Sequence, residues 1–376
     1  VYFFYYLYFY TEARFHFDAM HNLLLAALLG GVYALASFFS GRFAQRFGYL
    51  TSIRCGAAMM MVAFMACSQT ASLWLMIALV VAGCIGMSLT WPAMEALVSE
   101  GELPAQLQGV VGFYNVVWAG VAGFAYFTGG ALQQQWGWKS MFYVPSGLLV
   151  LELALATWLE KKIHGQPASA EPAPLPLLHP MKESYRSPIA PATFLKLAWV
   201  ANPMAYLAIN TIVSSVPTLA QRLNYSPMLA GFVCSIWLFT RAAAFVALWL
   251  WPGWHYRFRF LAAAYFVLMI SFGVMLLVPS LWVIVLAQVL LGPALSLIYY
   301  SSLFYSMDVG DTKGEHGGIH EAVIGLGNGT GPGVAAATLH FFPGHPGSGV
   351  WAVCLLLVPG LIALYWLRYR EPKPPA

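Results

Sequence analysis

The sequence predicts an all-α membrane protein in which twelve transmembrane helices form two six-helix repeats. Three observations predict this fold class. First, 60% of the residues are hydrophobic and only 9% are charged, whereas a soluble domain carries roughly 25% charged residues. Second, apolar runs long enough to cross a bilayer follow one another along the chain. Third, a weak sequence repeat relates the two halves. The lipid bilayer must therefore be the main surrounding medium.

Apolar runs of about 20 residues predict the membrane-spanning helices. The chain opens with Val1–Tyr10, which is too short to span a bilayer alone. Because the chain starts inside an aromatic apolar run, we expect the first helix to be truncated at the N-terminus. Eleven full-length spans follow, at residues 20–40, 51–68, 73–97, 108–131, 140–159, 196–217, 228–251, 260–278, 281–306, 317–340 and 348–367.

The distribution of basic residues predicts the orientation. If the loop after the second helix is cytosolic, fourteen Arg and Lys residues lie inside and three lie outside, with Arg241 within a span. Short cytosolic loops of membrane proteins carry such an excess. We therefore expect both termini in the cytosol and the protein in the cell (inner) membrane. The same distribution explains the net charge of +4, so nucleic acid is not an expected partner.

One linker divides the chain. Residues 160–195 are rich in proline and polar side chains, a composition typical of a flexible connector. The expected organisation is an N-terminal six-helix half (1–159), a cytosolic linker (160–195) and a C-terminal six-helix half (196–376).

The two halves repeat at an offset of 208 residues. At this offset Trp91-Pro92 falls on Tyr299-Tyr300, and Gly123-Phe124 falls on Gly331-Pro332. One offset that holds from the second helix to the fifth predicts a structural repeat. Tandem six-helix halves are a known transporter plan, with the substrate site between them near the middle of the membrane.

The basic stretch Gly41–Arg54, predicted to be a tight cytosolic turn, carries a family resemblance. Together with the helix count and the repeat, it resembles the loop signature Gly-x-Leu-Ala-Asp-Arg-x-Gly-Arg-Arg/Lys of the major facilitator superfamily. A positive turn in any polytopic protein is the alternative. Four residues occupy positions that the signature requires, namely Gly41, Ala44, Arg46 and Gly48.

Two departures from that signature matter. Gln45 replaces the acidic residue, and Tyr49-Leu50 replace the basic pair. In the family the acidic residue helps to latch the two halves near the start of helix eleven. The resemblance therefore implies a latch made by a neutral hydrogen bond, and a weaker or differently built gate.

Glycine ladders mark the fifth and eleventh helices. The clearer one is Gly325, Gly327, Gly329, Gly331-Pro332 and Gly333, and it resembles the Gly-Pro pattern of the family's antiporters. Such ladders let helices approach closely and bend. Ordinary small-residue packing is the alternative.

Arg241 is the most informative single residue. It lies midway along the eighth helix, where a charge costs at least roughly 2.5–3.5 kcal/mol and so indicates a cavity or a partner. Facing the cavity, it would favour an anionic substrate. A structural ion pair is the alternative.

Acidic residues and a histidine are candidates for coupling or gating. His320-Glu321 open the eleventh helix, where they could relay protons or cap the helix. Glu95 lies in the cytosolic third of the fourth helix, where we expect it to pair with Arg42 or Arg46 as part of the gate.

Uncharged residues complete the predicted cavity. Asn115 and Asn328 could bond a substrate or join helices. The aromatic residues of the fourth and tenth helices could form walls for an amphipathic ligand or belong to the core, and they are Trp91, Tyr299 and Tyr300.

The sequence predicts a secondary transporter that moves a small organic solute, amphipathic or anionic, by alternating access, with proton coupling. No phosphate-binding loop occurs, and the five scattered cysteines form no metal spacing, so we expect no enzyme activity, cofactor or metal. The chain is expected to act as a monomer. A membrane-embedded lipid-modifying enzyme and a non-transporting sensor on the same fold are the alternatives.

Overall fold

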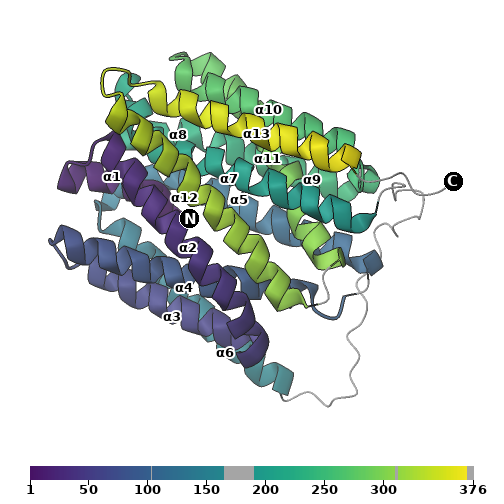
Figure 1. The fold of residues 1–376 in the computed structure, drawn as a ribbon. Helices are drawn as coiled ribbons and strands as arrows, with labels where there is room; N and C mark the ends of the chain where they lie inside the picture. The colour runs from purple at the N-terminus through teal and green to yellow at the C-terminus, as the bar shows by residue number, and fades with distance from the viewer. Residues whose placement is uncertain (103, 165–189, 310–311, 371–376) are drawn as a thin grey trace.

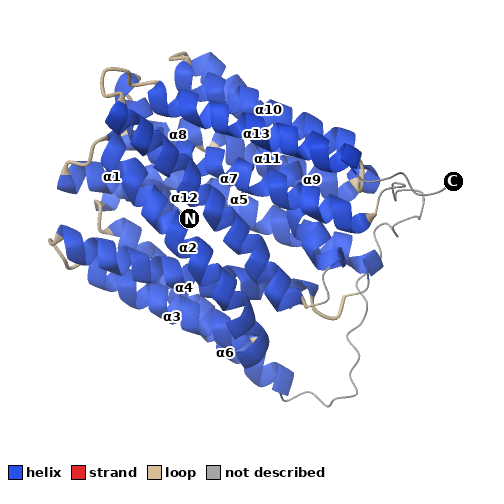
Figure 2. Cartoon of the chain, viewed as in Figure 1, coloured by secondary structure: helices blue, strands red, loops and turns tan. Residues whose placement is uncertain are grey.

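A computed structural model describes residues 1–102, 104–164, 190–309 and 312–370, and these residues form helices joined by short connections (Figure 2). No strand occurs among them, so the all-α prediction is confirmed. The elements are α1 (Tyr2–Phe15), α2 (Ala19–Phe47), α3 (Tyr49–Cys67), α4 (Leu73–Ser99), α5 (Pro104–Trp136), α6 (Ser140–His164), α7 (Pro191–Arg222), α8 (Pro227–Cys234), α9 (Ile236–Leu250), η2 (Pro252–Trp254), α10 (Phe258–Leu277), α11 (Leu281–Val309), α12 (Lys313–Phe341) and α13 (Ser348–Arg370).

Ten segments of the described chain are long and apolar enough to cross a membrane. The pair α8 and α9 counts as one of them, because they share the run Pro227–Leu250. The remaining two predicted spans are α1, which has 14 residues, and α12, whose apolar run is interrupted by glycines and polar residues. The layout of twelve spans therefore stays a prediction.

The predicted turn at Gly41–Arg54 is wrong in its extent. Helix α2 continues to Phe47, and α3 starts at Tyr49, so the break is the single residue Gly48. Its φ of 95° is a backbone conformation that glycine adopts without a steric penalty. The arginines of this stretch lie on regular helix, because one glycine is enough to reverse the chain.

Several other predicted bounds also change. The linker predicted at 160–195 loses its two ends to helices, since α6 runs to His164 and α7 starts at Pro191. The rest of it, 165–189, lies outside the described residues. Helix α12 starts at Lys313 instead of residue 317, and the predicted eighth helix is broken at Ser235.

The helix bounds support the predicted repeat. Adding 208 to the first residue of α4 gives that of α11 (73 and 281), and the same holds for α6 and α13 (140 and 348). The starts of α2 and α8 correspond in the same way (19 and 227), and those of α3 with α10 and of α5 with α12 agree within one residue.

The interface between the halves lies at the centre of the bundle. Figure 1 shows α3 and α6 on one side of the molecule and α10 and α13 on the other. Between them, α2 packs along α12, and α5 packs along α8 and α9. The repeat thus places equivalent helices in the two contacts, since α2 corresponds to α8 and α9, and α5 corresponds to α12.

Glycines bring α2 and α12 into backbone contact. A Cβ atom on Gly30 would overlap the backbone nitrogen of Gly329, and one on Gly41 would lie 2.7 Å from the Cα atom of Gly318. Another face of the ladder packs on α7, where a Cβ atom on Gly327 would overlap the carbonyl of Pro203. The ladder on α12 therefore serves two close helix contacts.

This packing predicts a large difference between two neighbouring glycines. Gly30→Ala is expected to lower the Tm of the detergent-purified protein by several degrees, because overpacking costs about 1–3 kcal/mol. Gly31→Ala is the matched control, since no atom lies within 4 Å of its added Cβ atom. Equal Tm values for the two variants would show that α2 and α12 separate freely.

Candidate functional site

A cavity of about 220 Å³ lies between the two halves. Helices α1, α2, α4, α5, α7, α11 and α12 all contribute to its wall. Most of the lining side chains are aromatic or aliphatic, while Glu321 carries a carboxyl group, and Asn210 and Asn328 carry amides. The cavity thus combines apolar walls with a few polar groups, as small-molecule sites do.

The structure divides the six residues predicted for the cavity. Trp91, Tyr299 and Asn328 line it. Arg241, Asn115 and Tyr300 do not, and this part of the prediction is corrected: all three are buried behind the wall. Consecutive residues of a helix point about 100° apart, and Tyr300 points to α5, where its hydroxyl donates to the Gln108 carbonyl.

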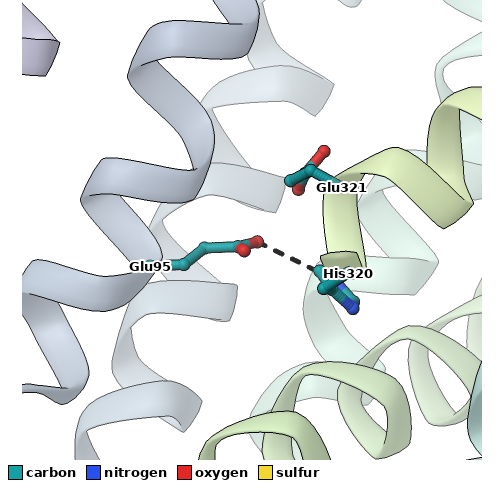
Figure 3. Close-up of side chains that lie close together, drawn as sticks. All are labelled: Glu95, His320 and Glu321. Atoms are coloured by element: carbon teal, nitrogen blue, oxygen red, sulfur yellow. Dashed lines mark ion pairs between the residues drawn. The ribbon is translucent and has the colours of Figure 1, made fainter. Parts of the chain in front are cut away.

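Glu321 belongs to a buried cluster with Glu95 and His320 (Figure 3). One ligand atom from each side chain lies within 4.8 Å of the others. The distance from Nε2 of His320 to Oε1 of Glu95 is 3.8 Å. Glu95 comes from α4 and the other two from α12, so the cluster crosses the interface between the halves.

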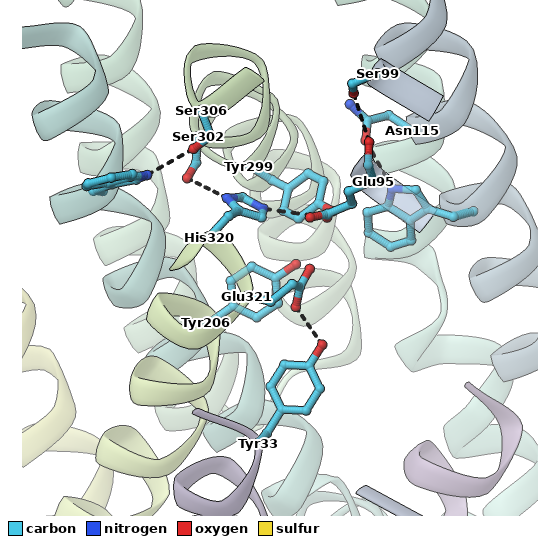
Figure 4. A network of polar contacts seen from close by, with 12 residues as sticks. Tyr33, Glu95, Ser99, Asn115, Tyr206, Tyr299, Ser302, Ser306, His320 and Glu321 are labelled. Atoms are coloured by element: carbon cyan, nitrogen blue, oxygen red, sulfur yellow. Dashed lines mark hydrogen bonds and ion pairs between the residues drawn. The ribbon is translucent and has the colours of Figure 1, made fainter. Parts of the chain in front are cut away.

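Hydroxyl groups hold the members of this cluster (Figure 4). Tyr299 donates a hydrogen bond of 2.9 Å to Oε1 of Glu95, and Tyr33 donates one of 2.6 Å to Oε2 of Glu321. The Ser302 hydroxyl lies 2.9 Å from Nδ1 of His320. One carboxyl oxygen of Glu95 and one of Glu321 also lie within 4.8 Å of each other.

Two predictions about these residues are wrong. Glu95 does not pair with Arg42 or Arg46, because its carboxyl group points to α11 and α12 instead. His320-Glu321 do not open or cap their helix, since α12 begins at Lys313, about two turns earlier. Because α12 starts four residues earlier than predicted, both residues lie inside the bundle, where Glu321 lines the cavity.

Arg241 is enclosed by aromatic rings. Its Cζ atom lies 4.7 Å from the ring centre of Trp118 and 5.1 Å from that of Tyr299. The shortest polar contact runs from Nη2 to the hydroxyl oxygen of Tyr206, at 3.4 Å, and Nε has no hydrogen-bond partner. No carboxylate of the described chain forms an ion pair with it, which makes it a buried cation with spare donors.

Asn115 supports this enclosure from α5. Its Oδ1 atom accepts a hydrogen bond of 3.1 Å from the indole of Trp118, and Trp118 lines the cavity. The sequence predicted that Asn115 either bonds the substrate or joins two helices. In the structure it does neither and instead orients Trp118, a residue of the cavity wall.

Polar contacts join the halves at the end of the bundle where α6 ends and α7 begins, which we call the linker end. Oε1 of Gln45 accepts a hydrogen bond of 3.1 Å from the backbone nitrogen of Gly314. This is the neutral hydrogen bond to the start of helix eleven that the sequence predicts. Beside it, Arg42 lies 3.9 Å from Glu315, and both side chains are largely exposed.

A second glutamine makes the equivalent contact between α5 and α9. Nε2 of Gln108 donates to the carbonyls of Leu248 and Trp249, at 3.0 and 3.1 Å, and Oε1 contacts His255. Tyr300 donates to the Gln108 carbonyl at 2.9 Å. The linker end is thus joined twice, at related positions of the two repeats.

Sequence reasoning missed several residues of the site, namely Tyr33, Tyr206, Asn210, Trp118 and Gln108. One signal was available for the first of them. Tyr33 stands 208 residues before Arg241, so the repeat places it at the equivalent point of the other half. The others are ordinary aromatic and amide residues whose direction the sequence alone does not reveal.

Comparisons with known proteins agree with this architecture. The sequence matches the Major Facilitator Superfamily over residues 1–319. The crystal structure of the human organic anion transporter MFSD10 (TETRAN) has a similar fold, with a TM-score of 0.68 and 14% sequence identity, over 97% of this chain and 89% of that chain. At this identity the likeness concerns the fold alone, and no curated protein matches the chain. Since the match covers most of the sequence, the chain belongs to the Major Facilitator Superfamily and is a multi-pass membrane transporter.

Proposed function

We propose that the protein is a secondary transporter that moves a small organic anion by alternating access, coupled to protons. The observation that carries the proposal is the position of Glu321. Glu321 lines the cavity, and one of its carboxyl oxygens also lies within 4.8 Å of a carboxyl oxygen of the buried Glu95. A solute in the cavity therefore meets the outermost member of a pair of carboxyl groups that spans the two halves.

Arg241 and the aromatic walls support an anion with an apolar body. A buried cation without a carboxylate partner favours a negative charge nearby, and Trp118, Tyr206 and Tyr299 separate it from the cavity only by their rings. The cavity offers these rings and Trp91 as surfaces for an aromatic or aliphatic group. MFSD10, which shares the fold, is named as an organic anion transporter.

The carboxyl pair supports proton coupling. Two ionised carboxylates whose oxygens lie within 4.8 Å of each other repel strongly when they are buried, so the pair favours a proton on one of them. The pair can therefore gain or lose a proton, and this change of charge alters the binding of an anion in the cavity. Tyr299 links the pair to Arg241, because its hydroxyl donates to Glu95 and its ring faces the guanidinium group, so the charge of the pair acts on the anion site.

The interface supports alternating access. The linker end is joined by Gln45 and Gln108, both of which make hydrogen bonds between the halves. From its basic residues we propose that this end, where α13 also ends, faces the cytosol in a cell (inner) membrane. Val1, for which the sequence also predicted the cytosol, lines the cavity instead. In the cycle these contacts break as the halves rock about the cavity. Because one chain supplies all of these residues, we propose that a monomer transports.

The two glutamine contacts predict a shift in this equilibrium. Gln45→Ala with Gln108→Ala is expected to favour a linker end that is open, because each lost neutral hydrogen bond contributes about 0.5–1.5 kcal/mol. Spin labels on the exposed positions Phe47 and Lys196 should then report longer distances. Gln69→Ala is the control, since Gln69 bonds only within one half. Unchanged distances in the double variant would argue against the latch.

Uptake into proteoliposomes tests the proposed function. Purified protein should accumulate members of a panel of labelled aromatic carboxylates and sulfonates when a pH gradient is imposed, and it should exchange them without a gradient. Protein-free liposomes and a panel of matched cations are the controls. Flux of cations with no flux of any anion would contradict the anion site, and flux that ignores the pH gradient would contradict proton coupling.

A further inference from the structure

We propose that Glu95, His320 and Glu321 form a binding site for a divalent transition cation that bridges the two halves. The sequence predicts no metal site, because the ligands stand 225 residues apart on two helices. The fold brings them together, and nothing in the proposed transport cycle requires a metal there. The chemistry of the three side chains suggests one.

The geometry is close to that of a metal site. In a tetrahedral zinc site the metal lies about 2.0–2.2 Å from nitrogen and oxygen ligands, which sets neighbouring ligand atoms about 3.4 Å apart. Nε2 of His320 lies 3.8 Å from Oε1 of Glu95, the oxygen that also accepts the hydrogen bond from Tyr299. One ligand atom from each of the three side chains lies within 4.8 Å of the others. Side-chain adjustments of under about 1 Å would complete the geometry.

Two atoms of the cluster lack partners. Nε2 of His320 and Oε2 of Glu95 have no hydrogen bond, although His320 is 0% exposed and Glu95 is 1% exposed. Figure 3 shows the two side chains pointing toward each other. Buried polar groups in native proteins are almost always satisfied. A cation between them would satisfy both atoms at once.

The surrounding hydroxyls orient the ligands as outer residues do in metal sites. The Ser302 hydroxyl forms a hydrogen bond with Nδ1 of His320, and Nε2 of the ring therefore faces Glu95. Tyr299 and Tyr33 each hold one carboxylate oxygen, on Glu95 and Glu321 respectively. These contacts leave one oxygen of each carboxylate available to a metal.

The ligand set selects the class of cation. One imidazole with two carboxylates suits Zn²⁺, Mn²⁺, Fe²⁺ or Co²⁺, whereas Mg²⁺ and Ca²⁺ prefer oxygen ligands alone. The charge also matches, because two carboxylates balance a divalent ion. Glu321 provides access, since it lines the cavity.

Metal binding has a consequence for transport. Glu95 belongs to the N-terminal half and His320 to the C-terminal half, so a bound ion holds the halves together at the cavity. Zn²⁺ then inhibits the transporter by preventing the halves from separating. This inhibition rests on the proposed transport function, but the binding does not.

The binding is tested on purified protein without any transport assay. Zn²⁺ is expected to raise the Tm, and Co²⁺ is expected to give the intense visible absorption of a four-coordinate site. Glu95→Gln and His320→Gln should each weaken Zn²⁺ binding by about 10-fold or more, measured by calorimetry, and Ser302→Ala should weaken it by about 10-fold. His345→Ala is the control, because His345 is an exposed histidine outside the cluster.

The outcomes separate a built site from an adventitious ion only. Equal Zn²⁺ affinity in the wild type and in the Glu95, His320 and Ser302 variants, or a loss confined to His345→Ala, would overturn the proposal. Ser302→Ala keeps the test valid if His320→Gln does not fold. Stabilisation by Mg²⁺ as strong as by Zn²⁺ would contradict the ligand class. If Zn²⁺ binds as expected but no solute is transported, the metal site stands and the transport proposal fails.

Discussion

Replacing Arg241 with methionine is expected to lower the uptake of organic anions by about 100-fold while the protein still folds. Arg241 acts on the cavity through its field, since its charge lies behind the rings of Trp118 and Tyr299. If the anion binds with its charge about 6 Å from the guanidinium group, the attraction between the two unit charges contributes about 2.8 kcal/mol at an effective dielectric constant of about 20. That energy corresponds to about a 100-fold change in binding. Methionine retains the apolar bulk among the rings.

Two further variants separate charge from packing. Arg241→Lys keeps the charge and is expected to retain most of the uptake, because the effect requires a cation and not a guanidinium. Arg14→Met is the control for loss of one positive charge, since Arg14 is exposed. Equal loss in Arg241→Lys and Arg241→Met would show that the residue holds the aromatic rings in place. Normal anion uptake in a folded Arg241→Met protein would contradict the anion site.

The sequence predicted the architecture well because hydrophobic runs and basic loops are each visible within a short, continuous stretch of residues. Most spans were placed within a few residues, and the 208-residue offset matches helix starts such as Leu73 and Leu281. Arg241 was also recognisable, because a charge in an apolar helix is conspicuous in any arrangement of helices. The resemblance predicted that Gln45 bonds near the start of helix eleven, and the structure identifies the partner as the backbone nitrogen of Gly314.

The cluster at the cavity could not be predicted, because it depends on how two helices are rotated and on where one of them begins. Starting α12 at residue 317 placed Glu321 at the end of the bundle, whereas its start at Lys313 places it about two turns inside. Glu95 was expected to pair with Arg42 or Arg46. Its actual partners come from α11 and α12, and only tertiary packing reveals them.

Replacing Glu321 with glutamine is expected to abolish the response of uptake to a pH gradient while exchange of the substrate continues. The amide cannot bind or release a proton in the transport cycle, but its oxygen can still accept the hydrogen bond from Tyr33. The ratio of uptake with and without a gradient should therefore fall to about one in Glu321→Gln. Glu100→Gln is the control, because Glu100 is exposed and outside the cluster.

Glu95→Gln makes the same test on the inner carboxyl group. If the two groups act as one proton-binding unit, either amide should remove the response, because a single remaining carboxyl group no longer shares its proton with a partner. A loss in Glu321→Gln alone would assign the transported proton to the group that faces the cavity, with Glu95 as its support. A full gradient response in both variants would contradict proton coupling at this pair. Anion movement would then depend on Arg241 and the membrane potential alone.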